Sequence, residues 1–128
     1  MSTSTKPINE LHAENIDWQQ RLAFYSDEIK IMSERIAEVA GKNTAKDIQA
    51  HVEHFQNQLI LQKELIDQLG HDIRAHEEYI VKNIEKNPTA VDHRQMNDHP
   101  GLRDRMSTFE TIFNALRKEL DIFLAQVM

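Results

Sequence analysis

Side chains that could carry out chemistry are concentrated in one stretch of the sequence. Four of the seven histidines lie in the run HVEHFQNQLILQKELIDQLGHDIRAHEEYI, from His51 to Ile80, with carboxylates between them. Imidazole and carboxylate groups are common zinc ligands and common general acids and bases. The first question is whether this stretch holds a metal or catalytic site, or is a packing helix with polar residues on its outer side.

Ligands on one helix must be three or four residues apart to share a face. His51 and His54 are the one histidine pair with that spacing, and Asp47 and Glu53 lie nearby. The chain contains no Glu-x-x-His, His-x-x-x-His or His-Glu-x-x-His pattern. Both histidines flank Val52, an apolar packing position, so we expect exposed polar side chains. A weak surface zinc site is the alternative.

Three aspartates stand four residues before a histidine, a spacing that resembles an acid–histidine dyad. The pairs are Asp47–His51, Asp67–His71 and Asp72–His76. No serine occupies an apolar packing position to act as nucleophile, so we expect ordinary helix-surface pairs and no enzyme. His93 and His99 each follow an aspartate in the run DHRQMNDH. We expect a solvated loop there, with a loop cation site as the alternative.

The composition disfavours several classes of function. The chain has 128 residues, no cysteine and a formal net charge of -6, from 21 acids and 15 bases. Without cysteine there is no disulfide and no thiolate nucleophile. An acidic chain without a basic run is a poor binder of nucleic acid and of anionic membranes. With no signal sequence and no span-length apolar run, we expect a cytoplasmic protein without a cofactor.

Apolar residues recur at alternating intervals of three and four in three long segments. This heptad seam is typical of helices that pack as coiled coils. Gly41 ends the first segment, Asn87-Pro88 ends the second, and Pro100 suits the first turn of the third. Residues 87–98 lack periodicity and are expected to form a loop. The seam residues are Ile8, Leu11, Trp18, Leu22, Tyr25, Ile29, Met32, Ile36 and Val39; Ile48, Val52, Phe55, Leu59, Ile66, Leu69, Ile73 and Ile80; and Leu102, Met106, Phe109, Phe113, Leu116, Leu120, Phe123 and Val127.

The three seams together predict the fold. We expect an all-α protein, an antiparallel up-down-up three-helix bundle with long coiled-coil-like helices over about residues 8–40, 44–86 and 99–127. The chain should divide into a disordered N-terminal tail, 1–7, and a single helical-bundle domain, 8–128.

Polar residues interrupt the seams at Asn15, Gln62 and His76. Buried polar residues of this kind commonly fix the register of packed helices. The antiparallel register is expected to place His76 near Glu110 and the start of the first helix, and a pH-sensitive joint is the alternative role. Gly70 should lie opposite Trp18 and make room for its indole.

Some apolar residues lie off the seams or at the hairpin tip, where the bundle is not expected to cover them. Such residues indicate surfaces that another chain could cover. Ile16, Phe24 and Ile31 lie off the first seam, although they could instead complete the internal core. The third helix is expected to end near residue 57 of the second, which would leave two helices alone at the hairpin tip. We expect a second subunit or another protein to cover that tip. The interface candidates are Ile16, Phe24, Ile31, Ile48, Val52 and Phe55.

No motif in the sequence is specific enough to indicate a family or a reaction. We interpret the chain as a non-enzymatic interaction or scaffold protein that acts through coiled-coil-type helix packing. Its partner is expected to be a second copy, forming a homodimer, or another helical protein. A metal-binding bundle built from histidines and acids is the alternative function, and a pH-responsive regulator is a third.

Overall fold

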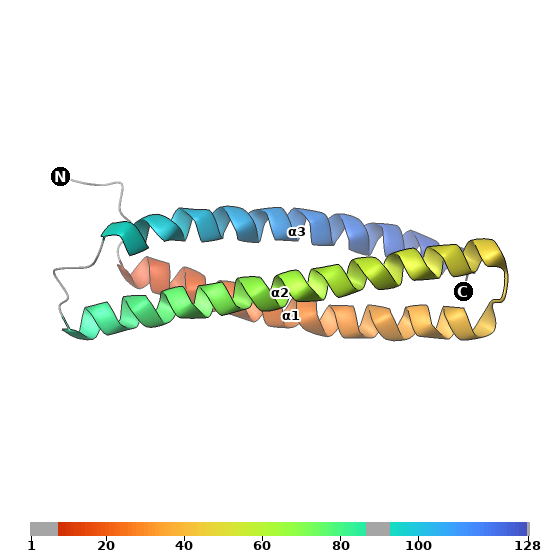
Figure 1. Ribbon diagram of the computed structural model, residues 1–128, viewed down its shortest axis with the longest axis horizontal. Helices are drawn as coiled ribbons and strands as arrows, with labels where there is room; N and C mark the ends of the chain where they lie inside the picture. Colours follow the sequence, from red (N-terminus) through yellow and green to blue (C-terminus); the bar gives the residue numbers. More distant parts are fainter. Residues whose placement is uncertain (1–7, 87–92, 128) are drawn as a thin grey trace.

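The computed structural model describes residues 8–86 and 93–127. Within these ranges the regular elements are three α-helices: α1 (Ile8–Lys42), α2 (Lys46–Lys86) and α3 (His93–Val127). Figure 1 shows α1 and α3 running in one direction and α2 running back in the other. The prediction of an all-α three-helix bundle is confirmed. None of the three helices, over the residues described, is both long and apolar enough to cross a membrane.

The core consists of the heptad residues of all three helices. A period of three and four keeps these side chains on one face of each helix, so the three faces meet along the bundle axis. Ile36, Ile73, Phe113 and Leu120 have no exposed surface, and Trp18 is 3% exposed. The bundle is therefore held together by one apolar core to which all three helices contribute, as the spacing predicts.

Helix α3 begins earlier than predicted, at His93 instead of residue 99, and Pro100 lies inside it. The expected loop therefore does not include 93–98, while its remaining part, 87–92, and the expected tail at 1–7 lie outside the described residues. His99 stands three residues before the seam residue Leu102 and is 1% exposed. His99 therefore extends the inner face of α3 by one turn. The apolar pattern did not predict this, because histidine is polar.

Helix α3 also covers more of the hairpin tip than predicted. The ring of Phe123 lies 5.2 Å from that of Phe55 and 5.4 Å from that of His51, measured between centroids. Val52 is 2% and Phe55 5% exposed within the single chain. These two interface candidates are therefore core residues and are not available to a partner, whereas Ile48 remains partly exposed.

Ion pairs beside the seams define how neighbouring helices are aligned. Between α1 and α3 they are Glu14–Arg103, Arg21–Glu110 and Glu28–Arg117, each separated by 89 residues in sequence. Between antiparallel α2 and α3 the pair is Asp72–Arg105, with an N–O distance of 2.9 Å. His12 pairs with Glu77 between α1 and α2.

Candidate interaction surface and buried histidine pair

A pair of buried histidines joins α2 to α3 near the start of α1. The Nε2 atom of His76 lies 3.2 Å from Nδ1 of His99, and the two residues are 5% and 1% exposed. The indole of Trp18 stacks on the His99 ring with centroids 4.9 Å apart. The other ring nitrogen of His99, Nε2, lies 2.9 Å from Oε1 of Glu14. The three helices therefore meet in one hydrogen-bonded chain of side chains.

The Glu14 carboxylate at the end of this chain is held by a guanidinium. Arg103 donates from Nη2 to Oε1 at 2.7 Å and from Nε to Oε2 at 3.2 Å. These hydrogen bonds from Arg103, together with that of His99 and the nearby positive charge, outweigh partial burial and lower the pKa of Glu14 to about 2. Glu14 is therefore a carboxylate throughout the range in which histidine titrates.

Glu110 is not the partner of His76, contrary to the sequence-based prediction. Its carboxylate accepts hydrogen bonds from Arg21 and from the hydroxyl of Tyr25. Burial, then the hydrogen bond to Glu110, raises the pKa of that hydroxyl to about 12. Glu110 lies eleven residues, about three helical turns, along α3 from His99, so the expected alignment of α2 with α3 was displaced by about that much. The start of α1 does reach the pair, through Glu14.

The other two polar residues of the seams are buried as well. Asn15 has no exposed surface and donates from Nδ2 to Oε1 of Glu77 at 2.9 Å. Gln62 is 3% exposed. No hydrogen-bond partner for Oδ1 of Asn15 or Oε1 of Gln62 lies among the described protein atoms. An unsatisfied buried oxygen lowers stability, so these residues are better suited to fixing register than to strengthening the bundle.

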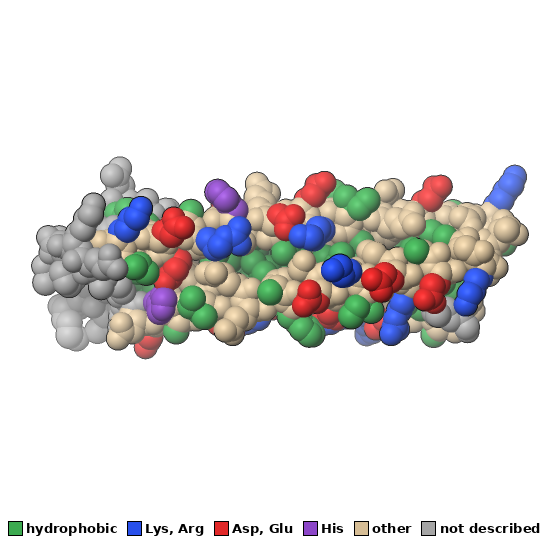
Figure 2. Space-filling model, turned by 90° about the horizontal axis from the view of Figure 1, so that it is seen from below, with side chains coloured by type: hydrophobic (Ala, Val, Ile, Leu, Met, Phe, Trp, Pro, Cys, Tyr) green, Lys and Arg blue, Asp and Glu red, His purple; other side chains and the backbone are tan. Residues whose placement is uncertain are grey.

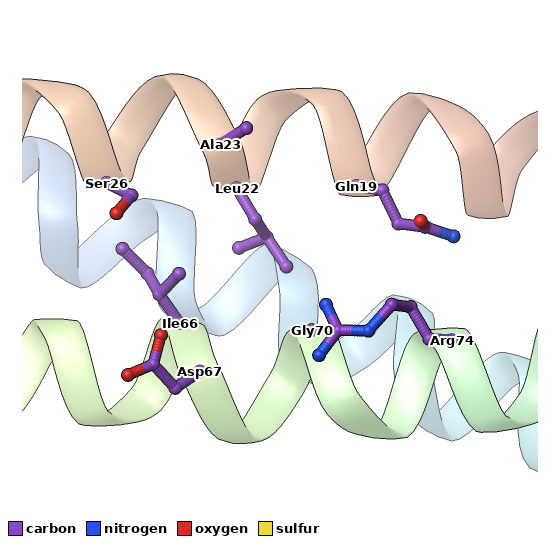
Figure 3. Close-up of a pocket in the computed structure, with 8 residues that line it drawn as sticks. All are labelled: Gln19, Leu22, Ala23, Ser26, Ile66, Asp67, Gly70 and Arg74. Carbon is purple, nitrogen blue, oxygen red and sulfur yellow. The ribbon is translucent and has the colours of Figure 1, made fainter.

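Gly70 is buried but does not accommodate Trp18, so that prediction is wrong. A methyl group at Gly70 would lie 3.2 Å from Nη1 of Arg74 and 3.8 Å from Cδ1 of Leu22. The position borders a cavity of about 330 Å³ between α1 and α2. Figure 3 shows Leu22 pointing from α1 toward α2 and Arg74 reaching back along α2 toward Gly70. Trp18 instead packs on His99.

The proposed zinc ligands His51 and His54 are exposed on α2. His51 lies against Phe123, and the edge of His54 lies against Phe55 at 5.2 Å between ring centroids. Among residues 8–86 and 93–127, as far as their side chains are described, no three histidine or acidic groups are arranged to hold a metal ion. A zinc site at His51 and His54 stays a prediction.

The apolar residues predicted to lie on the outside of α1 are exposed. The exposed fractions are 38% for Ile16, 58% for Phe24 and 52% for Ile31. Phe24 lies against Tyr25 at 6.0 Å between ring centroids. Ile31 borders a cavity that also includes the charged residues Arg35 and Asp121. This part of the surface therefore combines single apolar side chains with charges.

A second apolar surface, between α2 and α3, was not included among the interface candidates. Its exposed apolar side chains are Leu61, Leu65 and Ile112, at 50%, 42% and 46%. Leu65 and Ile112 border a cavity of about 360 Å³ whose floor includes the core residues Leu69 and Phe109. The sequence could have indicated this surface, because these residues lie beside the seams and widen the apolar stripe of each helix.

Charge is distributed differently over the faces of the bundle. Figure 2 shows the side seen from below in Figure 1, over α1 and α2, where acidic and basic side chains are interspersed with hydrophobic ones along much of the length. The three pairs from Glu14–Arg103 to Glu28–Arg117 run along the boundary of α1 and α3. At the cavity beside Leu65 and Ile112, Arg105 pairs with Asp72, and a further acid, Asp104, lines the same cavity.

Comparison of the chain with protein-family models, with curated proteins and with solved structures finds no match. The class of protein is therefore defined by its fold, a three-helix bundle with a buried histidine pair.

Proposed function

We propose that the chain is a non-enzymatic interaction protein that binds another helical chain through the surface between α2 and α3. The observation that carries this proposal is the exposure of Leu65 and Ile112 at an open, largely apolar cavity, with exposed Leu61 one turn away on α2. None of the three belongs to the buried core, so the part of their apolar surface that remains exposed is open to another chain. Clustered apolar surface on a folded protein is typical of a binding site.

Four polar side chains between the helices are used for packing, which supports the same proposal. His76, His99, Glu14 and Arg103 bond to one another between helices. Their hydrogen bonds hold elements in register and leave the histidine rings buried. A catalytic imidazole must instead reach a substrate.

Site-specific photo-cross-linking in cells that produce the chain tests this function. Benzoylphenylalanine at Thr108, an exposed residue that borders the cavity, should give a discrete protein adduct. The matched control is the same amino acid at Asp27, an exposed residue of α1. Adducts at Thr108 and not at Asp27 are expected. Absence of adducts at Thr108, or equal adducts at both positions, would contradict the proposal.

A further inference from the structure

A cavity in the groove between α1 and α2 has no part in the interaction surface proposed above. Its volume is about 330 Å³, near the lower end of the range for small-molecule pockets. It shares no lining residue with the cavity between α2 and α3. Figure 3 labels the side chains that line it, which come from both helices. Its chemistry is therefore considered separately.

The positive charge at this cavity belongs to Arg74. Its side chain extends back along α2, so that its guanidinium lies beside Gly70 (Figure 3). Among the described side chains, no carboxylate forms an ion pair with Arg74. Four other arginines each form such a pair: Arg21, Arg103, Arg105 and Arg117. In a chain with 21 acids and 15 bases, an arginine at a cavity without a carboxylate partner is an exception.

The acidic residues nearest to Arg74 along α2 are bonded elsewhere or point away from it. Asp67, at the other end of the cavity, accepts a hydrogen bond of 2.6 Å from Lys63. Glu77 is hydrogen-bonded to α1. Glu78 lies one turn after Arg74, whereas the arginine side chain extends in the opposite direction. The guanidinium can therefore accept an anion as its partner.

The other lining groups suit an anion that carries an apolar body. Leu22 and Ile66, which are 3% and 5% exposed, line the cavity from the core. In Figure 3 the amide of Gln19 lies at the same end of the cavity as Arg74, and Ser26 lies at the other end. A guanidinium and an amide both donate hydrogen bonds, and the planar guanidinium matches the two oxygens of a carboxylate.

The lack of a side chain at Gly70 leaves room for this arrangement. Glycine is unfavourable inside a helix relative to alanine, and Gly70 has no positive φ that would require it. An added methyl group would make ordinary contact with Leu22 at 3.8 Å, so core packing does not require glycine either. The same methyl group would lie 3.2 Å from Nη1 of Arg74 and would displace the guanidinium. A locally unfavourable residue without a packing reason is expected where function needs the space.

We propose that the cavity between α1 and α2 binds a small organic carboxylic acid. Its carboxylate accepts hydrogen bonds from Arg74 and Gln19, and its apolar body covers Leu22 and Ile66. Inorganic phosphate would satisfy the same donors but would make no apolar contact. Because Arg74 is exposed, the affinity is modest, and a ligand of about ten non-hydrogen atoms should bind with a Kd between about 0.1 and about 1 mM.

Titration of the nitrogen-15-labelled full chain with sodium benzoate, followed by two-dimensional NMR at constant ionic strength near pH 7, tests the proposal. Benzoate should shift the backbone amide signal of Gly70 and the side-chain amide signals of Gln19 in a saturable way. The other two glycines, Gly41 and Gly101, do not line the cavity, so their signals should stay unchanged. Benzamide has nearly the same shape without the charge and should cause no shift. Absence of a saturable shift with benzoate, or an equal shift with benzamide, would overturn the proposal.

Replacing Arg74 tests the contact with the anion. Arg74→Gln should weaken benzoate binding about 10-fold or more, because it removes charge-assisted hydrogen bonds. The matched control is Arg35→Gln, which removes the same charge from an exposed arginine at a different cavity. It should bind benzoate as the wild type does. Equal affinity of the two variants, both shown to be folded by far-ultraviolet circular dichroism, would overturn the proposal.

A series of anions tests the class of ligand. Affinity should rise from acetate to butyrate to benzoate, because a larger body covers more of the apolar surface of Leu22 and Ile66. Inorganic phosphate should bind more weakly than benzoate. Phosphate that shifted the Gly70 signal at concentrations as low as benzoate would show recognition of charge alone and would overturn the assignment of an organic acid.

Replacing Gly70 separates binding from stability. Gly70→Ala should weaken benzoate binding about 5-fold or more, as read from the side-chain amide of Gln19, because the methyl group displaces the Arg74 guanidinium. Gly101→Ala should bind as the wild type does. Unchanged affinity in Gly70→Ala would overturn the role given to this glycine. None of these outcomes alters the proposal for the surface between α2 and α3, which cross-linking at Thr108 tests independently.

Discussion

Arg103 of α3 holds the carboxylate of Glu14 of α1 with two hydrogen bonds, although the two residues are 89 positions apart in sequence. The same separation joins Arg21 to Glu110 and Glu28 to Arg117. Each pair follows the last by one heptad, and the sign alternates along both helices. Two parallel helices with this pattern attract in one alignment and repel after a shift of seven residues, so the three pairs determine how α1 and α3 are aligned.

The Glu14–Arg103 pair predicts a loss of stability in acid. The pKa of Glu14 lies at about 2 in the folded chain, below its ordinary value of 4.5. A lowered pKa contributes stability above about pH 4.5, and that contribution is lost as the pH falls from about 4.5 to about 2. Because the pair is partly open to solvent, we expect Glu14→Gln to cost about 1–3 kcal/mol near pH 7 and almost nothing near pH 2.

Urea unfolding at several pH values measures this difference. Glu38→Gln is a suitable control, because Glu38 is an exposed carboxylate on the same helix. If the stability difference between wild type and Glu14→Gln stays constant from neutral to acid pH, the ionised carboxylate of Glu14 contributes little.

The Glu28–Arg117 pair predicts recovery after a charge swap. Both oxygens of Glu28 accept hydrogen bonds of 2.7 Å from Nη1 of Arg117. Glu28→Arg and Arg117→Glu should each lower the free energy of unfolding by about 1 kcal/mol, and the double variant should recover about half of the combined loss. Glu28→Arg combined with Arg35→Glu carries the same net change without restoring the pair, so it should show no recovery of this kind. A coupling energy near zero in thermal unfolding would contradict the alignment role.

The seams were sufficient to predict the helices and the core, and insufficient to predict the alignment between helices. Residues such as Ile36 and Phe113 are buried because a heptad period turns every such position inward. A seam repeats every seven residues, so sliding one helix by a heptad leaves the apolar pattern unchanged. The seam therefore does not specify the alignment of α2 with α3. Glu110 was expected beside His76, whereas His99, eleven residues earlier in α3, is found there. The alternating charges at Glu14, Arg21 and Glu28 contained the missing information.

The sequence predicted three of the buried polar residues but missed His99 and the surface formed by Leu65 and Ile112. Asn15, Gln62 and His76 interrupt an apolar seam, so their burial follows from position. His99 was placed in a loop because the residues before it lack an apolar period, yet its ring is covered by Trp18. The pairing of Leu65 with Ile112 depends on how α2 and α3 are aligned, which the seam alone does not specify.

Replacing Gly70 with alanine is expected to stabilise the fold. The new methyl group of Gly70→Ala would approach the flexible end of the exposed Arg74 side chain at 3.2 Å and make ordinary contact with Leu22. Arg74 can move at little cost, and alanine is favoured over glycine in a helix by about 1 kcal/mol. We therefore expect Gly70→Ala to raise the free energy of unfolding by about 0.5–1 kcal/mol.

Gly101→Ala provides the matched control for that measurement. Gly101 lies within α3, and no atom would lie within 4 Å of its added methyl group, so its variant reports helix preference alone. The two variants should be stabilised by similar amounts in urea unfolding. A Gly70→Ala chain less stable than the wild type, beside a stabilised Gly101→Ala chain, would mean that the close packing around Leu22 tolerates no added atom.

The His76–His99 pair predicts a large loss of stability when His99 is replaced. His99→Phe keeps an aromatic ring for Trp18 to stack on, but it removes the hydrogen bonds to His76 and to Glu14. Loss of buried hydrogen bonds costs about 1–3 kcal/mol. His51→Phe is the control, because His51 also lies against an aromatic ring but is exposed. It should change stability by less than about 0.5 kcal/mol in the same unfolding experiment.

The same pair is where a pH-sensitive joint would act, which stays a prediction from the sequence. The bond between Nε2 of His76 and Nδ1 of His99 needs one nitrogen to accept, and two imidazolium rings offer no acceptor. Two protons would also place like charges side by side, and, among the described residues, the carboxylate beside the pair, Glu14, lies against His99 and also pairs with Arg103. A second proton on the pair should therefore lower stability, and urea unfolding at pH 7.5 and at pH 5.5 measures the effect. His76→Leu should reduce this fall, and a variant that kept all of it would exclude the pair as the sensor.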